Sequence, residues 1–490
     1  MPQRTTAALI VIGDEILKGS TIDTNSGFLA SRLHKIGVQL KRVSVIGDDV
    51  EDISEEISRF SKKFEIVFTT GGVGPTHDDK TYLGLAKAFN ADLEASPDIL
   101  NAVSKYMHNT SAKNESFALK LSNIPVNSKL LWGSHPLTGA SSPFPIVRFH
   151  NVIAFPGVPA FFERAFDSLK NELFPPEKYP TRFSETVYTS LDEFQFSSSL
   201  DRIAEKYDGV VEIGSYPVIK NKYYKTKLII ESDELALGQD VIKEIQDFLH
   251  DAQVYYDEAP WDSTVIKMET FIRRQEDDFS NKIRQATDII DKILDEYSLE
   301  EIALSFNGGK DCTVLLHFLR LAVDKKYGAG KQLQGFHIMC DDQFPEATQF
   351  IIDAARNYNI IVHELPGPLK VGLERLKVLK PKITAVLMGS RLTDPKGKYM
   401  KSPTQWTDND WPTVLRVCPV LYWSYQDVWK ALRGLCIPYC ILYDMGYTSL
   451  GGRENTFKNP KLKVSTPDGK EKYLPAFMLQ ESDFERNGRE

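Results

Sequence analysis

The stretch Leu304-Ser305-Phe306-Asn307-Gly308-Gly309-Lys310-Asp311 decides the fold of the second half of this 490-residue chain. Apolar residues at 302–306 predict a buried strand, and the apolar spacing of 312–323 predicts a helix soon after the two glycines. Glycine lets a backbone approach an anion closely, and a helix N-terminus offers free N–H groups. We therefore expect an anion-binding loop rather than a bare turn, although its spacing is not that of a Walker A loop.

Strands and helices alternate on both sides of this loop. The other elements predicted in this half are strands at 334–340, 360–365 and 385–388 and helices at 280–297, 346–358 and 369–379. The first half has predicted strands at 8–12, 40–46 and 66–70 and helices at 25–36 and 53–60. Such alternation predicts an α/β protein with two doubly wound, mostly parallel domains of three αβα layers.

Two breaks in the pattern divide the chain. The proline-rich segment 174–180 ends the first domain, and 257–260 is typical of a linker. Between them, a strand at 226–231 and a helix at 240–249 predict a small α+β segment. The predicted domains are 1–175, a companion domain with linker at 176–262, and 263–490.

Composition excludes some functions. The chain has 59 Lys and Arg against 67 Asp and Glu, a net charge of −8, which argues against a nucleic-acid-coating protein. No apolar stretch is long enough to span a membrane, so we expect no membrane partner. Five cysteines and no secretion signal predict a cytoplasmic protein. Cys436 and Cys440 are better explained as buried thiols than as a zinc site.

The second half resembles a known family. Residues 305–311 resemble the pyrophosphate loop of the PAPS-reductase-like ATP pyrophosphatases, and further motifs narrow the resemblance to eukaryotic, animal-type FAD synthases. Those motifs are Gly389-Ser390-Arg391-Leu392-Thr393-Asp394-Pro395, 419–429 and 447–456. The resemblance implies a nucleotidyltransferase, an FMN adenylyltransferase, that converts FMN and ATP to FAD and pyrophosphate with Mg²⁺. Because the FMN phosphate is already an oxyanion, positioning and charge neutralisation suffice for catalysis.

Most predicted site residues follow from these motifs, whereas Asp341 and Asp342 are predicted because they come directly after the strand at 334–340. The predicted catalytic residues are Asn307, Lys310, Asp311, Arg391 and Arg453. The predicted ATP and pyrophosphate site comprises Ser305, Phe306, Asn307, Gly308, Gly309, Lys310, Asp341 and Asp342, and the predicted FMN site comprises Arg391, Asp394, Trp423 and Arg453. Several alternatives stay open. Asp311 either orients the loop or joins the metal shell, the two arginines could form ordinary ion pairs, and Asp341, Asp342 and Asp394 could be turn residues. Trp423 and Trp429 could be core aromatics.

A second glycine loop, at 69–81, also follows a predicted strand. Acidic residues follow the first two strands as well, which suggests a metal-assisted phosphate-ester site, with solvated surface acids as the alternative. The predicted site residues are Asp14, Asp48, Gly71, Gly72, Gly74, Asp78 and Asp79.

This first half resembles the molybdopterin-binding domain of the molybdopterin adenylyltransferases and CinA proteins. The resemblance rests on 13–17, 23–25, 45–49, 71–81, 156–159 and 214–217. In animal-type FAD synthases this domain is associated with FAD hydrolysis to FMN and AMP. The resemblance implies Asp48 and Asp79 as ligands of a divalent metal, whose identity we leave open. A purely regulatory or oligomerising role is the alternative.

Other functions compete with FAD synthesis. A PAPS reductase needs a cysteine in its C-terminal tail, and 465–490 contains none. Molybdopterin adenylylation by the first half, or FAD binding and delivery without turnover, remain alternatives. The expected partners are ATP, FMN and FAD, apo-flavoproteins as FAD acceptors, and a second copy of the chain through its N-terminal domain.

Overall fold

The computed structural model describes residues 4–108, 115–134, 139, 141–179, 182–219, 221–339, 342–395, 397–465 and 470–489. The chain divides into two compact units. The first contains Met1–Ile219 and Tyr224–Val254, and the second contains Lys220–Tyr223 and Tyr255–Glu490. Each unit is described by itself.

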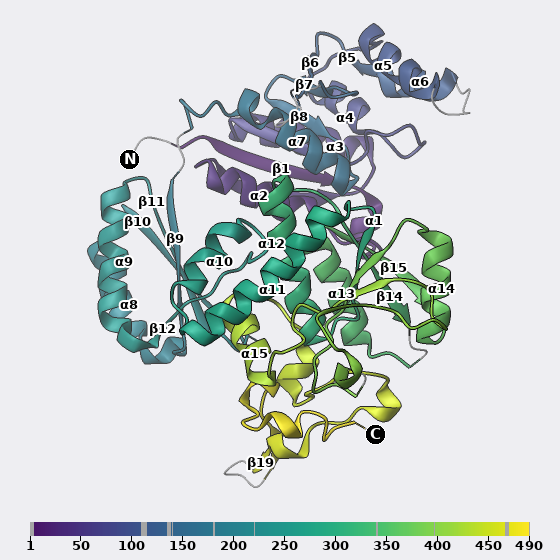
Figure 1. The fold of residues 1–490 in the computed structure, drawn as a ribbon. Coiled ribbons are helices and arrows are strands. Elements are labelled where there is room, and N and C mark those ends of the chain that lie inside the picture. Colours follow the sequence, from purple (N-terminus) through teal and green to yellow (C-terminus); the bar gives the residue numbers. More distant parts are fainter. Residues whose placement is uncertain are drawn as a thin grey trace. The chain divides into compact units, whose positions relative to one another are not determined.

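The first unit is built on a six-stranded sheet with the order β2-β1-β3-β8-β7-β6 (Figure 1). The first four strands in that order run parallel, and β7 and β6 are antiparallel additions at one edge. The strands are β1 (Thr6–Ile12), β2 (Gln39–Ile46), β3 (Ile66–Thr70), β6 (Lys129–Leu131), β7 (Ile146–Phe149) and β8 (Val152–Phe155). The mostly parallel α/β fold predicted for this half is confirmed.

Helices cover both faces of this sheet. Along the buried strand β1, Ala7, Leu9 and Val11 pack in the core that includes α2 and α7. Their neighbours on the opposite face pack with α3 and α4. Since successive side chains of a strand point to opposite faces, β1 carries both cores of a three-layer domain. The helices are α1 (Asp14–Leu17), α2 (Asn25–Lys35), α3 (Val50–Lys63), α4 (Thr81–Ala88), α5 (Pro97–His108), α6 (Glu115–Ser122) and α7 (Pro159–Leu173), and a hairpin pairs β4 (Leu93–Ala95) with β5 (Asn123–Pro125).

The remainder of the first unit is an antiparallel sheet with the order β10-β11-β9-β12. Its elements are β9 (Phe183–Thr189), α8 (Ser197–Lys206), β10 (Val211–Pro217), β11 (Thr226–Ser232), α9 (Leu235–Leu249) and β12 (Gln253–Val254). Helix α9 begins five residues before the predicted start at 240. Gly238 lies inside this longer helix and allows α9 to pack closely on β9. Any larger residue would place a Cβ 2.1 Å from the ring of Phe183.

The second unit has a sheet with the order β15-β14-β13-β16-β18-β17, in which only β17 is antiparallel. The strands are β13 (Ile302–Ser305), β14 (Leu333–Met339), β15 (Ile360–Pro366), β16 (Ala385–Leu387), β17 (Thr404–Trp406) and β18 (Leu415–Val417). The helices are α10 (Thr264–Ile272), α11 (Asp277–Glu296), α12 (Lys310–Tyr327), α13 (Pro345–Asn357), α14 (Leu369–Leu379) and α15 (Tyr425–Gly434). This sheet confirms the second predicted doubly wound domain.

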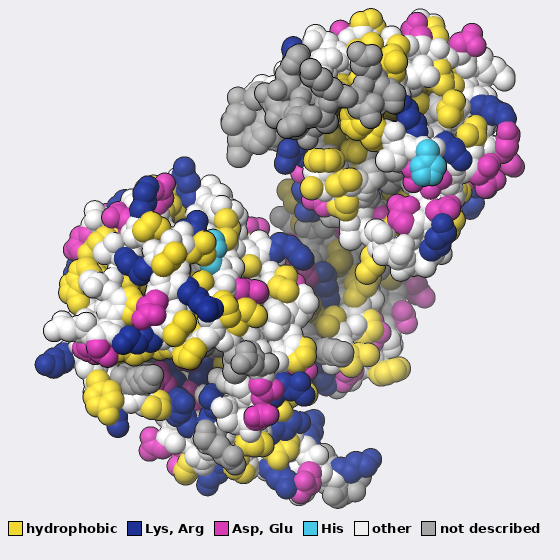
Figure 2. All heavy atoms as spheres, turned by 90° about the vertical axis from the view of Figure 1, so that its right-hand side faces the viewer, with side chains coloured by type: hydrophobic (Ala, Val, Ile, Leu, Met, Phe, Trp, Pro, Cys, Tyr) yellow, Lys and Arg dark blue, Asp and Glu magenta, His cyan; other side chains and the backbone are white. Residues whose placement is uncertain are grey.

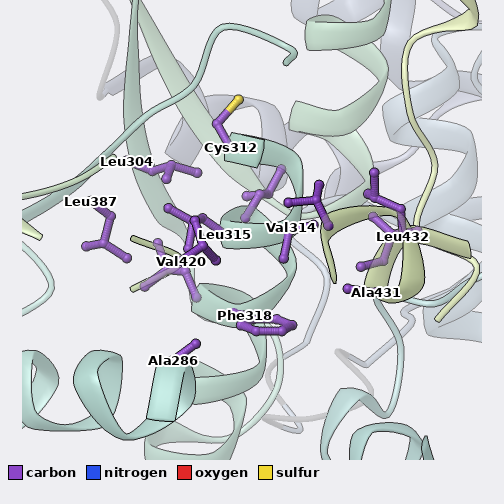
Figure 3. Close-up of a cluster of buried hydrophobic side chains, with 14 of the residues drawn as sticks. Ala286, Leu304, Cys312, Val314, Leu315, Phe318, Leu387, Val420, Ala431 and Leu432 are labelled. Carbon is purple, nitrogen blue, oxygen red and sulfur yellow. The ribbon is translucent and has the colours of Figure 1, made fainter. Parts of the chain in front are cut away.

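Helix α12 forms the centre of this unit. Leu304 of β13 packs with α11, α12 and α15 on one face of the sheet, whereas Ala303 packs with α14 on the other. Figure 3 shows this core, where Val314, Leu315 and Phe318 of α12 meet side chains from the sheet and from α15. Burial on several sides holds the start of α12 in a fixed place after β13.

The chain after α15 consists of short 3₁₀ turns and one hairpin, β19 (Lys463–Ser465) and β20 (Glu471–Tyr473). Its last 3₁₀ turn is Ser482–Phe484. Among the residues described, no helix is both long and apolar enough to cross a membrane. On the face drawn in Figure 2, acidic and basic side chains are interspersed among apolar ones.

Candidate active site

The loop that joins β13 to α12 is held by its own side chains. Gly308 has φ +72°, a left-handed conformation that favours glycine. The Asn307 side-chain oxygen accepts the Gly309 N–H at 3.0 Å and the Cys312 thiol at 3.0 Å. Helix α12 begins at Lys310, whose N–H donates to the Tyr443 hydroxyl at 2.9 Å. The Asn307 side chain therefore fixes the shape of the loop, whereas its predicted role in catalysis stays a prediction.

The Lys310 side chain lies beneath this loop, and only 2% of it is exposed. Its ammonium group is 3.0 Å from Asp311 Oδ2 and also pairs with the Glu485 carboxylate. It lies over the rings of Tyr425 and Tyr443, 5.3 and 5.9 Å from their centroids. The Lys310 ammonium group thus lies out of water between two carboxylates and two aromatic faces, which compensate a positive charge at this place.

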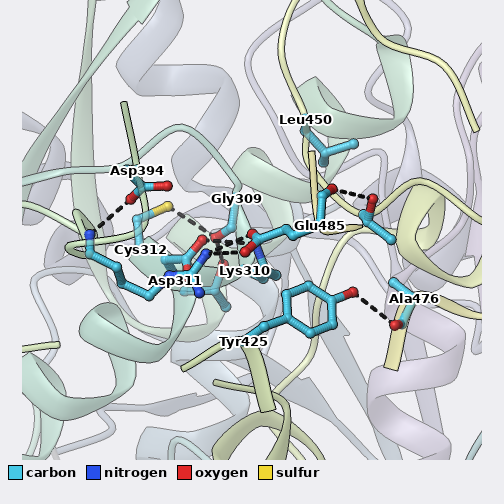
Figure 4. Close-up of polar contacts among 12 residues, drawn as sticks. Gly309, Lys310, Asp311, Cys312, Asp394, Tyr425, Leu450, Ala476 and Glu485 are labelled. Atoms are coloured by element: carbon cyan, nitrogen blue, oxygen red, sulfur yellow. Dashed lines mark hydrogen bonds and ion pairs between the residues drawn. The ribbon is translucent and has the colours of Figure 1, made fainter. Parts of the chain in front are cut away.

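Arg391 is the second buried cation, with a side chain 1% exposed. Its Nε is 2.8 Å from Asp311 Oδ1, and its Nη2 donates to both Glu485 oxygens at 2.6 Å. Lys310, Asp311, Arg391 and Glu485 thus form one cluster of two cations and two carboxylates, which we call the ion group (Figure 4). The ion group is formally neutral, as burial requires.

Electrostatics keep two members of the ion group, Asp311 and Arg391, ionised. Burial raises the pKa of the Asp311 carboxyl, but Lys310 and Arg391 lower this pKa by more, so the net shift is downward. Burial lowers the pKa of Arg391, but Asp311 and Glu485 outweigh burial and raise it above its usual value. Both groups are therefore charged at neutral pH.

Asp394 lies at the edge of the ion group. Its Oδ2 accepts the Arg391 backbone N–H at 2.8 Å, and its Oδ1 is 3.5 Å from the Arg486 guanidinium. Burial, together with the nearby Asp311 charge, raises the pKa of Asp394 above its usual range. The structure thus brings Asp394 together with Arg391, as the shared sequence motif predicts.

Two further predicted residues meet at the next loop of the sheet. The backbone N–H of Arg453 donates to the Asp342 carbonyl at 2.8 Å, and the N–H of Glu454 donates to the Asp342 carboxylate at 2.6 Å. The Arg453 side chain is exposed. The predicted Asp341 lies outside the described residues.

The two tryptophans lie in the core. Trp423 is 3% exposed and makes edge contacts with Phe279 and Phe318, at centroid distances of 5.6 and 5.8 Å. Trp429 is 4% exposed and packs on a cluster of tyrosines. Both positions match the alternative of core aromatics, and flavin stacking by Trp423 stays a prediction. Phe306 is buried and Ser305 half-buried.

Glu485, Tyr443 and Tyr425 are members of this site that sequence reasoning missed. Glu485 lies 175 residues after Lys310 and 94 after Arg391. The tail around it has no helical or strand periodicity, so no local pattern identifies it. Glu485 comes into contact with Lys310 and Arg391 only when the tail folds against α12.

The glycine loop of the first unit is tightly built. Gly71 has φ +101°, and a Cβ there would lie 2.0 Å from the Ile12 carbonyl oxygen. Gly72 has φ +63°, and a Cβ would lie 2.4 Å from Thr81 Oγ1. The Thr81 hydroxyl donates to the Gly71 carbonyl at 2.7 Å and its N–H donates to the Gly72 carbonyl at 2.9 Å. This crowding explains why glycines are required here.

Asp79 closes the same loop. Its Oδ1 accepts the Gly74 N–H at 2.7 Å, and its Oδ2 accepts the Thr76 N–H at 2.7 Å. A cavity of about 80 Å³ is lined by Gly74, Asp79, Tyr82 and Lys120, among others. The Lys120 ammonium group also donates to the Thr76 carbonyl. A loop with backbone N–H groups, one acid and one lysine around a cavity has the donors of an anion site.

The acids of the first two strands meet at the same edge. The Asp14 N–H donates to Asp48 Oδ2 at 2.9 Å, and the Asp48 N–H lies 3.4 Å from Asp14 Oδ1. Burial raises the pKa of Asp48, and the negative charges of Glu15, Asp14 and Asp78 raise it further. Within the described residues, no group of three or more His, Cys, Asp or Glu side chains is arranged to hold a metal ion. Metal binding by Asp48 and Asp79 stays a prediction.

Profiles of known protein families match three parts of the chain. One described as "Probable molybdopterin binding domain" matches 8–175, and one described as "FAD synthase, middle domain" matches 181–258. A third, "Phosphoadenosine phosphosulfate reductase domain", matches 301–378 and 367–458.

Individual relatives extend these matches. The chain is 54% identical to a Caenorhabditis elegans protein described as "Probable FAD synthase", over 100% of this chain and 98% of the relative. A crystal structure of Candida glabrata FMN adenylyltransferase is 26% identical, with a TM-score of 0.44, and covers 47% of this chain and 96% of that chain. A crystal structure of Thermoplasma acidophilum CinA is 30% identical, with a TM-score of 0.30. The match covers 35% of this chain and 98% of that chain.

Proposed function

The chain belongs to the FAD synthase family, and from this premise we propose how its residues convert FMN and ATP to FAD. The family assignment confirms the resemblance inferred from the motifs. The reaction is an adenylyl transfer, in which a phosphate oxygen of FMN attacks the α-phosphorus of ATP and pyrophosphate leaves. Its main requirements are an in-line arrangement and compensation of negative charge.

The observation that carries this proposal is the loop between β13 and α12 with the ion group beneath it. The N-terminus of α12 directs its dipole toward the loop, and Asn307 and Gly309 set the loop's shape. We assign the pyrophosphate of ATP to this loop. Arg453, whose side chain is exposed, would bind phosphate oxygens, because a guanidinium matches their geometry. Lys310 and Arg391 act from below through their charge.

We further propose that Mg²⁺ enters with ATP. Both carboxylates of the ion group already pair with cations, and the described part of the chain shows no cluster of His, Cys, Asp or Glu side chains arranged to hold a metal ion. Mg²⁺ in nucleotide sites uses one or two carboxylates plus the substrate's phosphates and waters, which is compatible with this arrangement. The ion would neutralise phosphate charge. The carboxylate of Asp311 is better suited to orient Lys310 and Arg391 than to bind metal.

The test is direct. The full-length protein is incubated with FMN, ATP and Mg²⁺, and FAD and pyrophosphate are measured. We expect equal amounts of both, and at least about a hundredfold slower synthesis by Asp311→Asn, because small displacements of positioned groups cost about that much. Asp288→Asn, an exposed acid on α11, is the control and should match the wild type. Tight FAD binding without pyrophosphate would instead support FAD delivery, and an unaffected Asp311→Asn would refute the assignment.

We propose FAD hydrolysis to FMN and AMP, with a divalent metal, as a second activity located in 1–175. The cavity lined by Gly74, Asp79 and Lys120 supports an anion site there. The test uses the full-length Asp311→Asn protein, in which we expect FAD synthesis to be strongly slowed, with FAD and several divalent metals and without ATP. Release of FMN and AMP that is lost on adding Asp79→Asn supports the proposal. Release that does not depend on Asp79, or none with any metal, refutes it.

Three broader proposals remain. The four described cysteines are free, buried thiols, which supports a reducing, cytoplasmic location. We propose that apo-flavoproteins accept the FAD and that copies of the chain associate through the N-terminal domain. Light scattering of the full-length protein and of a chain lacking 1–175 would test the association.

A further inference from the structure

The C-terminal tail brings a carboxylate to the two cations beneath the pyrophosphate loop. Glu485 follows the 3₁₀ turn Ser482–Phe484, and 9% of its side chain is exposed. Both of its oxygens accept from Arg391 Nη2 at 2.6 Å, and one also pairs with the Lys310 ammonium group. Glu485 is thus the member of the ion group that lies farthest from the loop in sequence, 175 residues after Lys310.

The backbone around Glu485 is held independently of this carboxylate. The Thr448 hydroxyl donates to the Glu485 carbonyl at 2.6 Å. The Asn459 amide, which is fully buried, donates to Thr448 Oγ1 at 2.9 Å and to the Phe484 carbonyl at 2.7 Å. Because these contacts involve no atom of the Glu485 side chain, a Glu485→Gln substitution removes one charge and leaves the anchoring of the tail in place.

The charge of Glu485 matters for the leaving group. With Glu485, the ion group contains two cations and two carboxylates, whereas without its charge the ion group carries one net positive charge. Lys310 and Asp311 directly follow Gly308 and Gly309 at the start of α12, so this charge is carried next to the loop to which we assign pyrophosphate. A polyanion over this loop is attracted more strongly when the ion group is positive, because a buried charge is poorly screened.

We propose that Glu485 is a positioning residue of adenylyl transfer that acts through Lys310 and Arg391. Its carboxylate fixes both cations beneath the loop and cancels part of their charge, so that pyrophosphate is held in place and then released. This inference rests on the proposed FAD synthesis and assigns a role to a tail residue that no motif indicates.

The experiment compares four full-length proteins: wild type, Glu485→Gln, Glu485→Asp and Glu481→Gln. Glu481 is an exposed acid on the same tail and serves as the matched control. Steady-state FAD formation gives kcat and the KM for ATP and FMN, and inhibition by inorganic pyrophosphate gives its Ki against ATP. Circular dichroism verifies that each variant is folded.

For Glu485→Gln we expect kcat to fall about tenfold, the KM for FMN to stay within about twofold, and the Ki for pyrophosphate to fall about three- to tenfold. A tighter complex with pyrophosphate combined with slower turnover is an effect that lost folding does not produce. Glu485→Asp retains the charge, so its Ki should stay within about twofold of wild type while kcat recovers in part. Glu481→Gln should match the wild type.

Two results would overturn the inference. One is a Glu485→Gln protein with wild-type kcat, and the other is a lower kcat with an unchanged or higher Ki for pyrophosphate. If Glu485→Gln does not fold, the Glu485→Asp protein decides. A raised Ki for pyrophosphate in Glu485→Asp would overturn the inference, whereas a wild-type Ki with a reduced kcat supports it. Failure of the wild type to make FAD would instead refute the proposed function, so the two failures are distinguishable.

Discussion

The chain contains two glycine loops at the carboxyl ends of parallel strands, and they are stabilised in different ways. The first, after β3, is held by hydrogen bonds of Thr81 and Asp79 to the loop backbone. The second, after β13, has the buried ion group beneath it, completed by Glu485 from the tail. The same βα loop geometry is therefore stabilised by backbone hydrogen bonds in one unit and adjoins a buried group of charges in the other.

The largest expected effect comes from removing a cation of the ion group. Lys310→Met leaves Asp311 and Glu485 with one shared partner, and breaking a buried pair costs about 3–5 kcal/mol of unfolding free energy. Chemical denaturation followed by tryptophan fluorescence measures this, since five of the six tryptophans lie in the second unit.

The matched control for that prediction is Lys325→Met in the same helix, α12. Lys325 pairs with Asp291 at 2.7 Å, but 61% of its side chain is exposed, so we expect a loss below about 1 kcal/mol. Equal losses for the two variants would mean that burial of the ion group does not distinguish the second loop from the first.

The next effect tests the first loop. Gly71→Ala places a Cβ against the Ile12 carbonyl at a φ of +101°, so we expect about 2–3 kcal/mol of destabilisation. Gly19→Ala is the control, because its φ is +70° but no atom lies within 4 Å of the added Cβ, and about 1 kcal/mol is expected. Hydrogen exchange of amides 66–81 reports on this region, and equal exchange in both variants would contradict the packing argument.

A third effect concerns acid sensitivity of the helix that follows the second loop. Burial lowers the pKa of His317 in α12 to about 3. Below about pH 6.5 the His317 imidazole binds a proton in the unfolded chain but not in the folded chain. The free energy of unfolding is therefore highest above pH 6.5 and decreases as the pH falls. Between pH 6.5 and 5 the loss is about 2 kcal/mol.

His317→Gln should flatten this pH dependence. Urea unfolding at pH 7, 6 and 5, monitored by tryptophan fluorescence, provides the measurement. A variant whose stability falls with acid as steeply as that of the wild type would show that other groups cause the loss.

The smallest effect concerns Asp79. Asp79→Asn replaces the charged acceptor of the Gly74 and Thr76 N–H groups by a neutral one, which should weaken the loop by about 1 kcal/mol. Faster hydrogen exchange of amides 74–79 is the expected readout. His77→Gln, whose side chain is 99% exposed in the same loop, should leave exchange unchanged.

Much of the fold could be predicted because its signals are local. The strand at Ile66–Thr70 and the helix at Leu369–Leu379 have the predicted bounds. Helix α12 is longer than the predicted 312–323 at both ends, because it begins at Lys310, inside the loop motif, and ends at Tyr327. The strands of the middle sheet other than β11 were not predicted, since short antiparallel strands with one exposed face leave a weak pattern.

The sequence alone determined the class of fold, the two glycine loops and the family, because apolar periodicity and motif spacing are properties of neighbouring residues. Only the tertiary structure decided which side chains meet. It buried Lys310 and Arg391 beneath the second loop, placed Trp423 in the core, and brought Glu485 from the end of the chain to both cations. The physical reason is that a charge can be buried only with its counter-charge, and that partner is chosen by packing in space.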